Sequence, residues 1–254
     1  MNILFTICGR AGSKGFKNKN LKEMNGVPLV YYTLASIKAY VDAHPENSVS
    51  VSVNTDSPEL VDCIRKQNTV KDIFFVDRKE SLAGDTAPKV EVIKDTYLTL
   101  RKEKSFDVVI DLDITSPYRR LEDIENIISE FSSNKEYDIV FSVVQARRSP
   151  YFNMVEKKEN GFFRKICESN YTARQQAPRS YEMNASIYAY NPVFLASDIK
   201  KTILDYNCGI TEMPDYLVLD IDSEEDFEMM QFLHTYYCNI DSKLNDIYVL
   251  AKNL

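Results

Sequence analysis

The sequence predicts an α/β protein with a mostly parallel sheet and helices on both of its faces. Two observations predict this fold class. Short apolar runs alternate with segments of helical periodicity through residues 1–145, and a chain of 254 residues is long enough for one such domain with a large core. Strands joined by helical crossovers pair in parallel. In sheets of this type, ligands bind beyond the carboxyl ends of the strands.

Apolar runs predict the strands, and apolar residues at helical spacing predict the helices. The predicted strands are 2–8, 49–53, 73–76, 107–111 and 138–144. The predicted helices are about 28–42, 58–67, 88–102 and 121–132. The loops that follow the strands then share one edge of the sheet, and they are 9–20, 54–57, 77–87, 112–120 and 145–150.

The alternation breaks between residues 145 and 183. Asn160-Gly161 is a hairpin signal with a short strand on either side, and a polar, unpatterned stretch follows from Tyr171. We interpret 145–183 as an arm inserted into a single domain, 1–254, that contacts substrate, a second subunit or both. Beyond it we predict strands at 185–190 and 216–221, and a helix at 223–234 that opens with a capping box of Ser223 and Asp226.

The loop after the first strand is rich in glycine and in positive charge. The first 22 residues contain no acidic residue, although the chain as a whole carries a net charge of −7. Their basic residues are Arg10, Lys14, Lys17, Lys19 and Lys22. Glycines such as Gly12 let an anion approach bare backbone N–H groups, Ser13 adds a hydroxyl donor, and Arg10 can bind two phosphate oxygens. The loop therefore suits a triphosphate, although the glycines alone would also fit a tight turn between solvated lysines.

The glycine spacing excludes three better-known phosphate loops. A Walker A loop needs Gly-Lys followed by Ser or Thr, and here the order is Ser13-Lys14-Gly15. Dinucleotide-binding and kinase loops need G-x-G-x-x-G, whereas this chain has G-x-x-G-x-x-G. ATPase, dehydrogenase and kinase functions are therefore disfavoured.

Composition excludes further classes. An acidic protein is a poor partner for nucleic acid. The five cysteines are widely spaced without a C-x-x-C pair, which disfavours a disulfide framework or zinc site and indicates a reducing cytoplasm. No segment is apolar enough over a sufficient length to predict a membrane span.

Two pairs of aspartates recur at predicted strand ends. Asp220 and Asp222 lie two residues apart, which in a strand places both side chains on one face. Two such carboxylates would hold Mg²⁺ together with substrate phosphate oxygens. Asp111 and Asp113 have the same spacing, and for them a metal site and a plain strand end are equally open. A triphosphate loop beside a carboxylate pair indicates nucleotidyl transfer, with attack on the α-phosphorus and release of pyrophosphate.

The motifs resemble those of the CMP-sialic acid synthetases, the acylneuraminate cytidylyltransferases, over nearly the whole chain. They are Arg10-Ala-Gly-Ser-Lys-Gly, Lys19-Asn-Leu, Ser81-Leu-Ala-Gly-Asp-Thr, Thr115-Ser-Pro-Tyr-Arg, Arg174-Gln-Gln-Ala-Pro, Asn184-Ala-Ser-Ile-Tyr and Asp220-Ile-Asp-Ser-Glu-Glu-Asp. The resemblance implies a Rossmann-like domain whose arm builds a homodimer. It also implies CTP and a nine-carbon 2-keto sugar acid as substrates, with Mg²⁺ as cofactor.

The resemblance implies roles for individual residues. The CTP triphosphate would be held by Arg10, Gly12, Ser13, Lys14 and Lys19. The cytidine would lie near Asn20, Arg78 and Asp85. The metal would be bound by Asp220 and Asp222, and the sugar acid by Asp113, Ser116, Arg174, Gln175 and Asn184. Catalysis would rest on Arg10, Lys19 and Asp222, with Asp222 or water taking the proton.

One departure from the family pattern bears on the sugar. The sialic acid enzymes usually have Gln-Pro-Thr-Ser-Pro where this chain has Asp113-Ile-Thr-Ser-Pro. The Asp version resembles the bacterial branch that acts on legionaminic acid, and N-acetylneuraminate stays open. Two functions of other classes also stay open: a glycosyltransferase with Asp111-Leu-Asp113 as its D-x-D metal motif, and a non-catalytic nucleotide-binding protein.

Overall fold

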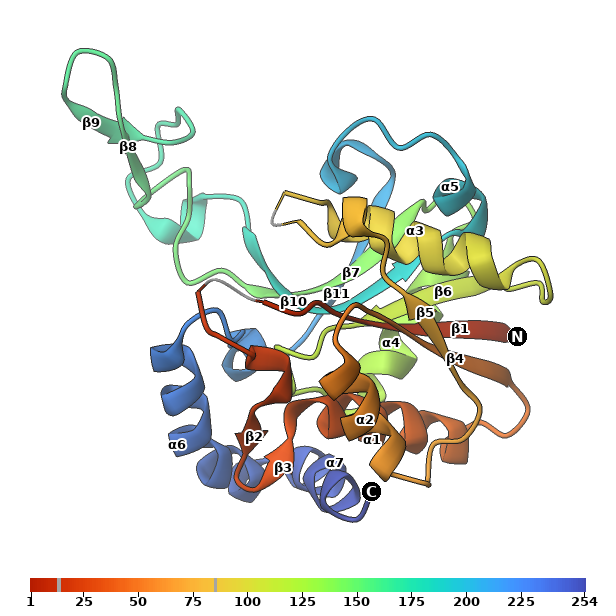
Figure 1. Cartoon of the computed structure of the whole chain (residues 1–254). Coiled ribbons are helices and arrows are strands. Elements are labelled where there is room, and N and C mark those ends of the chain that lie inside the picture. The colour runs from red at the N-terminus through yellow and green to blue at the C-terminus, as the bar shows by residue number, and fades with distance from the viewer. Residues whose placement is uncertain (13–14, 85) are drawn as a thin grey trace.

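The computed structural model describes residues 1–12, 15–84 and 86–254. At its centre is a seven-stranded sheet in the order β11-β7-β10-β6-β1-β4-β5 (Figure 1). The strands are β1 (Asn2–Gly9), β4 (Ser48–Thr55), β5 (Ile73–Asp77), β6 (Val108–Leu112), β7 (Ile139–Gln145), β10 (Tyr181–Tyr190) and β11 (Cys208–Glu212). Only β10 runs antiparallel to its sheet neighbours, β6 and β7, among these described strands. The predicted mostly parallel sheet is confirmed.

The central strands are buried on both faces. In β1, Ile3 and Phe5 pack into one apolar cluster, while Leu4 between them packs into another on the opposite face. All five residues of β6 are buried. Because both faces are covered, these strands read in the sequence as continuous apolar runs instead of alternating ones.

Helices cover each face of the sheet, as predicted. One face carries α1 (Leu29–Ala43), α2 (Pro58–Lys66), α4 (Leu121–Ser133) and α7 (Ser242–Lys252), whose apolar residues join the larger cluster. The other face carries α3 (Lys89–Leu100) and the short α5 (Pro192–Ala196). α6 (Glu224–Ile240) precedes α7 and packs against it. Its predicted capping box is confirmed, since Ser223 Oγ accepts from the Asp226 N–H at 3.2 Å and Asp226 Oδ2 accepts from the Ser223 N–H at 2.8 Å.

The predicted strand at 216–221 is wrong. A 3₁₀ helix occupies Asp215–Val218, and the chain then runs extended past Asp220 with the Ile221 N–H donating to the Thr115 carbonyl oxygen at 3.0 Å. The edge of β7 is already paired with β11. The residues of β11 are half-exposed and only weakly apolar, so the sequence did not predict this strand. The apolar run instead buries Leu217 and Ile221 directly in the core.

The predicted hairpin around Asn160-Gly161 is confirmed. β8 (Val155–Lys157) and β9 (Phe163–Lys165) pair antiparallel, and Gly161 has a φ of +82° that favours glycine. The hairpin projects away from the central sheet at the upper left of Figure 1. A second small antiparallel pair joins β2 (Glu23–Met24) and β3 (Val27–Pro28). Across the described ranges, no helix is both long and apolar enough to cross a membrane.

Candidate active site

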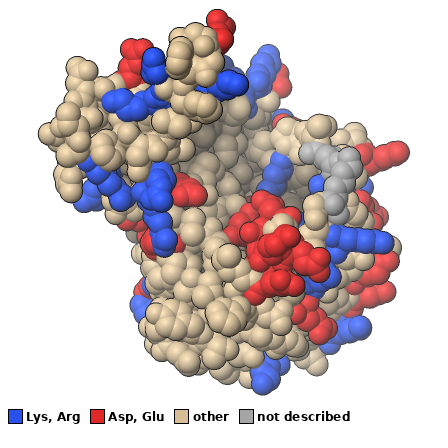
Figure 2. Space-filling model, turned by 90° about the vertical axis from the view of Figure 1, so that its left-hand side faces the viewer, with Lys and Arg blue, Asp and Glu red and all other residues tan. Residues whose placement is uncertain are grey.

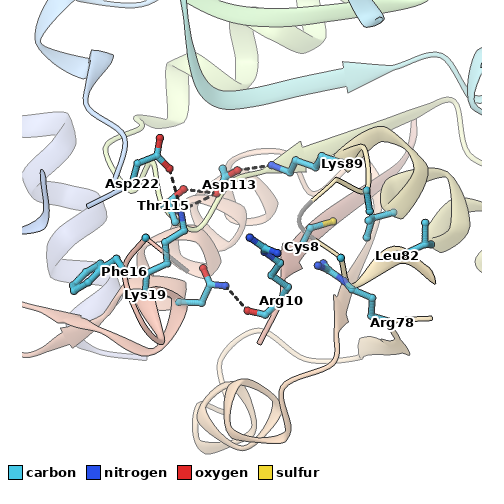
Figure 3. Close-up of a pocket in the computed structure, with 15 residues that line it drawn as sticks. Cys8, Arg10, Phe16, Lys19, Arg78, Leu82, Lys89, Asp113, Thr115 and Asp222 are labelled. Atoms are coloured by element: carbon cyan, nitrogen blue, oxygen red, sulfur yellow. Dashed lines mark hydrogen bonds and ion pairs between the residues drawn. The ribbon is translucent and has the colours of Figure 1, made fainter. Parts of the chain in front are cut away.

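A pocket of about 470 Å³ opens where β1, β5 and β6 end (Figure 3). Its walls include Arg10, Lys19, Asn20, Arg78, Asp113 and Asp222, all predicted as site residues. Lys19 and Asp222 lie on one side of the pocket, and Arg78 and Leu82 lie on the other. The pocket thus lies at the carboxyl ends of the strands, where the site is predicted. Ser13, Lys14 and Asp85, which were also predicted, lie outside the described residues.

The loop after β1 is held by close packing and backbone contacts. A Cβ on Gly9 would lie 2.4 Å from Leu60 Cδ2, so a side chain there would force the buried Leu60 to move. The Ala11 N–H donates to Asp56 Oδ1 at 2.7 Å, and Gly12 has a φ of +71°. Asn20 is buried, and its Nδ2 donates to the Arg10 carbonyl oxygen at 3.2 Å. This contact closes the loop on itself and ties the position of Asn20 to that of Arg10.

Lys19 joins the loop to the carboxylates near the far end of the chain. Its Nζ donates to the Ile221 carbonyl oxygen at 2.9 Å and forms an ion pair with Asp222 Oδ1 at 3.2 Å. Gly15 makes the approach possible, because a Cβ there would come within 3.0 Å of the Asp222 carbonyl oxygen. The predicted triphosphate loop and the predicted metal carboxylates therefore lie against each other.

Asp220 and Asp222 do not share the face of a strand. Asp222 is exposed, whereas Asp220 is half-buried and its Oδ1 accepts from Ser116 Oγ at 3.1 Å. Burial raises the pKa of Asp220, and the nearby carboxylates of Asp113 and Asp222 raise it further. A cation held by Asp220 and Asp222 would offset this repulsion between carboxylates. In the described part of the chain, no group of three or more His, Cys, Asp or Glu side chains could hold a metal. Two carboxylates fit Mg²⁺ that also takes phosphate oxygens from its substrate.

Arg78 is oriented by a residue that the sequence analysis missed. Its Nε donates to Asn54 Oδ1 and its Nη2 donates to the Asn54 carbonyl oxygen, both at 3.0 Å. Asn54 is buried in β4, and its own Nδ2 donates to Thr96 Oγ1 at 3.0 Å. β4 alternates Ser and Val before Asn54, so its polar residues gave no signal that singled out Asn54. The guanidinium is thereby fixed against the pocket wall.

Asp111 and Asp113 both form an ion pair with the same lysine, Lys89. Lys89 Nζ lies 2.7 Å from Asp111 Oδ2 and 2.5 Å from Asp113 Oδ2. Asp111 is fully buried and also accepts from Thr6 Oγ1 at 2.8 Å. Burial would raise the pKa of Asp113, but the charge and hydrogen bond of Lys89 and the donors of Thr115 hold it well below its usual range. The metal alternative for this pair is therefore disfavoured, and the strand-end alternative is supported. Lys89 itself was missed.

A buried arginine lies beneath these carboxylates. Arg119 has no exposed surface, and its guanidinium donates to the carbonyl oxygens of Asp113 and Ser116 and to the hydroxyls of Thr33 and Ser186. Burial lowers its pKa to about 10, which leaves it charged at neutral pH. Arg119 therefore fixes the loop that carries Asp113 and Ser116.

The other predicted sugar contacts lie in different surroundings. Arg174 and Gln175 are exposed on the arm, where Arg174 Nη2 donates to the Ala146 carbonyl oxygen at 3.2 Å. Asn184 is buried in β10, and its Nδ2 donates to the Leu217 carbonyl oxygen at 3.1 Å while its Oδ1 accepts from Ser142 at 2.6 Å. Asn184 thus positions the segment that leads to Asp220. Roles for these residues toward the sugar stay predictions.

The fold and the pocket together define an α/β protein that gathers basic side chains and carboxylates at the carboxyl ends of its strands. The chain belongs to the cytidylyltransferase family, whose model matches residues 4–247. It is therefore a nucleotidyltransferase that uses a cytidine nucleotide, and the resemblance drawn from its motifs is confirmed.

Three known proteins illustrate the relationship. The chain is 36% identical to post-translational flagellin modification protein B of Campylobacter coli, over 91% of its own length and 94% of the relative's. It is 35% identical, with the same coverage, to the CMP-N,N'-diacetyllegionaminic acid synthase of Campylobacter jejuni. A CMP:2-keto-3-deoxy-manno-octonic acid synthetase solved with CTP shares the fold, with a TM-score of 0.65 at 15% identity over 93% of this chain and all of that one.

Proposed function

We propose that this protein is a Mg²⁺-dependent cytidylyltransferase that joins CTP to a nonulosonic acid, with legionaminic acid or a close analogue as the acceptor. The observation that carries the proposal is the contact between Lys19 and the Ile221–Asp222 segment, which places the basic loop against the carboxylate pair. The legionaminic assignment is supported by the similarity to the Campylobacter jejuni synthase and by the residue at position 113.

The reaction follows from these residues. The anomeric hydroxyl of the sugar acid forms a bond to the α-phosphorus of CTP, the bond from that phosphorus to the bridging oxygen breaks, and pyrophosphate leaves. Arg10 and Lys19 hold the phosphates and stabilise the charge that grows on them. Asp220 and Asp222 would hold Mg²⁺, which when bound neutralises phosphate charge. The proton of the attacking anomeric hydroxyl passes to Asp222 or to water. The side chain of Asp222 is exposed, so both acceptors are within reach of the pocket.

The acceptor stays open between legionaminate and N-acetylneuraminate. Lys89 neutralises the charge of Asp113. Asp113 therefore does not repel the carboxylate of a sugar acid bound in the pocket. The complete burial of Asp111, together with its contact with Lys89, weighs against the glycosyltransferase alternative, because a D-x-D motif must present both carboxylates to a metal in the pocket.

We further propose that the arm pairs two copies of the chain in the cytoplasm. Val155, Phe162 and Phe163 of the hairpin are each about 60% exposed, which is unusual for neighbouring apolar side chains. Residues 145–183 are also rich in Arg and Lys within an acidic protein. In Figure 2, basic side chains gather at the upper left and acidic ones gather across the hollow. A two-fold pairing could bring such surfaces together.

A substrate panel tests the proposal. The protein is incubated with CTP, Mg²⁺ and one of four acids: legionaminate, N-acetylneuraminate, pseudaminate or keto-deoxyoctulosonate. Pyrophosphate release is measured together with the CMP-sugar formed. We expect the highest kcat/KM with legionaminate. A preference for the eight-carbon acid would contradict the acceptor class, and release of UDP or CMP from a sugar nucleotide would favour the glycosyltransferase.

A further inference from the structure

Lys89 occupies a place that is unfavourable for a lysine on its own. It is the first residue of α3, where the helix carries partial positive charge that disfavours another cation. Two carboxylates offset this, and burial, which would lower the pKa of Lys89, is outweighed so that its pKa lies well above the usual value. The ammonium is therefore charged at neutral pH and held within hydrogen-bonding distance of both Asp111 and Asp113.

These contacts leave hydrogen-bonding capacity on the Lys89 ammonium. A lysine has three N–H donors. Lys89 Nζ donates one to Asp113 Oδ2 and lies beside Asp111 Oδ2 as an ion pair, so the two carboxylates engage at most two of them. Its side chain is 34% exposed and belongs to the pocket wall, reaching from the start of α3 toward Asp113 (Figure 3). The ring of Tyr188 flanks it, with its centroid 5.6 Å from Nζ. One donor therefore stays available on the pocket side.

The charges around Lys89 indicate what this donor can bind. Asp111 and Asp113 contribute two negative charges, and Lys89 and the buried Arg119 contribute two positive charges. Asp220 lies near Asp113 and adds no positive charge. The cluster therefore has no net positive charge, and it offers little net attraction to a carboxylate or phosphate. A hydroxyl or amide oxygen can be bound by one well-placed donor. A ligand that buried this donor without accepting its hydrogen bond would lose binding free energy.

We propose that Lys89 is a substrate-binding residue that donates its third N–H to an uncharged oxygen of a bound substrate, a hydroxyl or an amide carbonyl. The inference rests on the proposed function for the identity of the substrates. Two of them carry such oxygens: the ribose of CTP and the sugar acid. A lysine that only stabilised the fold would affect unfolding and leave substrate recognition unchanged.

Two variants distinguish an effect of Lys89 on substrate binding from an effect on the stability of the fold. Lys89→Met removes the donor but leaves the buried Asp111 without its positive partner, and we expect it to lower the melting temperature. Lys89→Met/Asp111→Asn removes one positive and one negative charge together, which keeps the net charge of the cluster unchanged and preserves the acceptor for Thr6. Lys79→Met is the matched control, because Lys79 pairs with Asp95 at the surface and 65% of its side chain is exposed.

Calorimetry measures the Kd of CTP and of 2′-deoxy-CTP without sugar acid, and steady-state kinetics measure the KM of the sugar acid at saturating CTP. If the donor binds the ribose, the preference for CTP over 2′-deoxy-CTP falls by about tenfold in both Lys89 variants. If it binds the acceptor, that preference is kept and the KM of the sugar acid rises by about tenfold or more.

Two results would overturn the inference. One is that both quantities stay within about twofold of the wild type, as expected for Lys79→Met. The other is an effect in Lys89→Met that disappears in the double variant, because the unpaired Asp111 charge would then be the cause. If the wild type forms no CMP-sugar with any acid, the proposed acceptor fails, and the comparison of CTP with 2′-deoxy-CTP alone decides on Lys89.

Discussion

Lys19 and Asp222 are in contact although they lie 203 residues apart in the chain, with Nζ 3.2 Å from Oδ1. The same ammonium donates to the Ile221 carbonyl oxygen at 2.9 Å. A phosphate-binding loop and a carboxylate pair would each be ambiguous by itself. Their contact would bring the proposed triphosphate and its counter-ion into one place, which is the requirement of nucleotidyl transfer.

Lys19→Ala should lower kcat by a factor of about 10²–10³, because the variant loses a charge that stabilises the phosphates in the transition state. Steady-state pyrophosphate release measures the effect. Lys17→Ala is the matched control, since Lys17 lies exposed in the same loop. Equal kinetics in the two variants would remove Lys19 from the site.

Arg119→Met should destabilise the fold by about 3–5 kcal/mol, because it deprives two buried carbonyl oxygens and two hydroxyls of their donor. Urea unfolding at neutral pH measures the change. Arg101→Met, at the exposed end of α3, should stay within about 0.5 kcal/mol of the wild type. A similarly small effect of Arg119→Met would show that the loop carrying Asp113 is held by other contacts.

His234 should make the protein less stable in mild acid. Burial among Tyr32, Tyr118 and Tyr248 lowers its pKa to about 4, below the 6.5 of an ordinary histidine. Between these values the unfolded chain binds the proton more readily, so stability falls as the pH drops from about 6.5 to 4, by up to roughly 3 kcal/mol.

The measurement is urea unfolding at several pH values for the wild type and His234→Phe. The variant should lose this component of the pH dependence while keeping the rest. Parallel pH profiles for the two proteins would mean that His234 does not titrate differently on folding.

Phe162→Ser/Phe163→Ser should shift the protein from dimer to monomer, because the hairpin loses its exposed apolar surface. Sedimentation velocity at micromolar concentration measures the state. Val193→Ser is the control, since Val193 is 78% exposed on α5, outside the arm. A wild-type protein that is already monomeric would contradict the proposed pairing.

The sequence could predict what local patterns encode. The alternation of apolar runs and helical periodicity predicted the sheet and its first four helices, and the Ser223–Asp226 pair predicted the start of α6. It could not predict contacts that only the fold creates. Lys89 and Asp113 lie on different elements 24 residues apart, so nothing local indicates their ion pair. The apolar run at 216–221 was misassigned as a strand. Its residues are buried next to a sheet edge that β11 already pairs with, and such a buried segment has the same apolar pattern in the sequence as a strand.

The most direct test of the account is the turnover of Asp222→Asn with CTP, Mg²⁺ and legionaminate, measured as pyrophosphate and CMP-sugar formed together. The account predicts equal amounts of both products from the wild type and a loss of about 10²-fold or more in the variant, because it removes a proposed metal ligand. Asp246→Asn, at an exposed position of α7, should behave as the wild type. Undiminished turnover by Asp222→Asn would contradict the central claim that the carboxylates facing Lys19 form the catalytic half of the site.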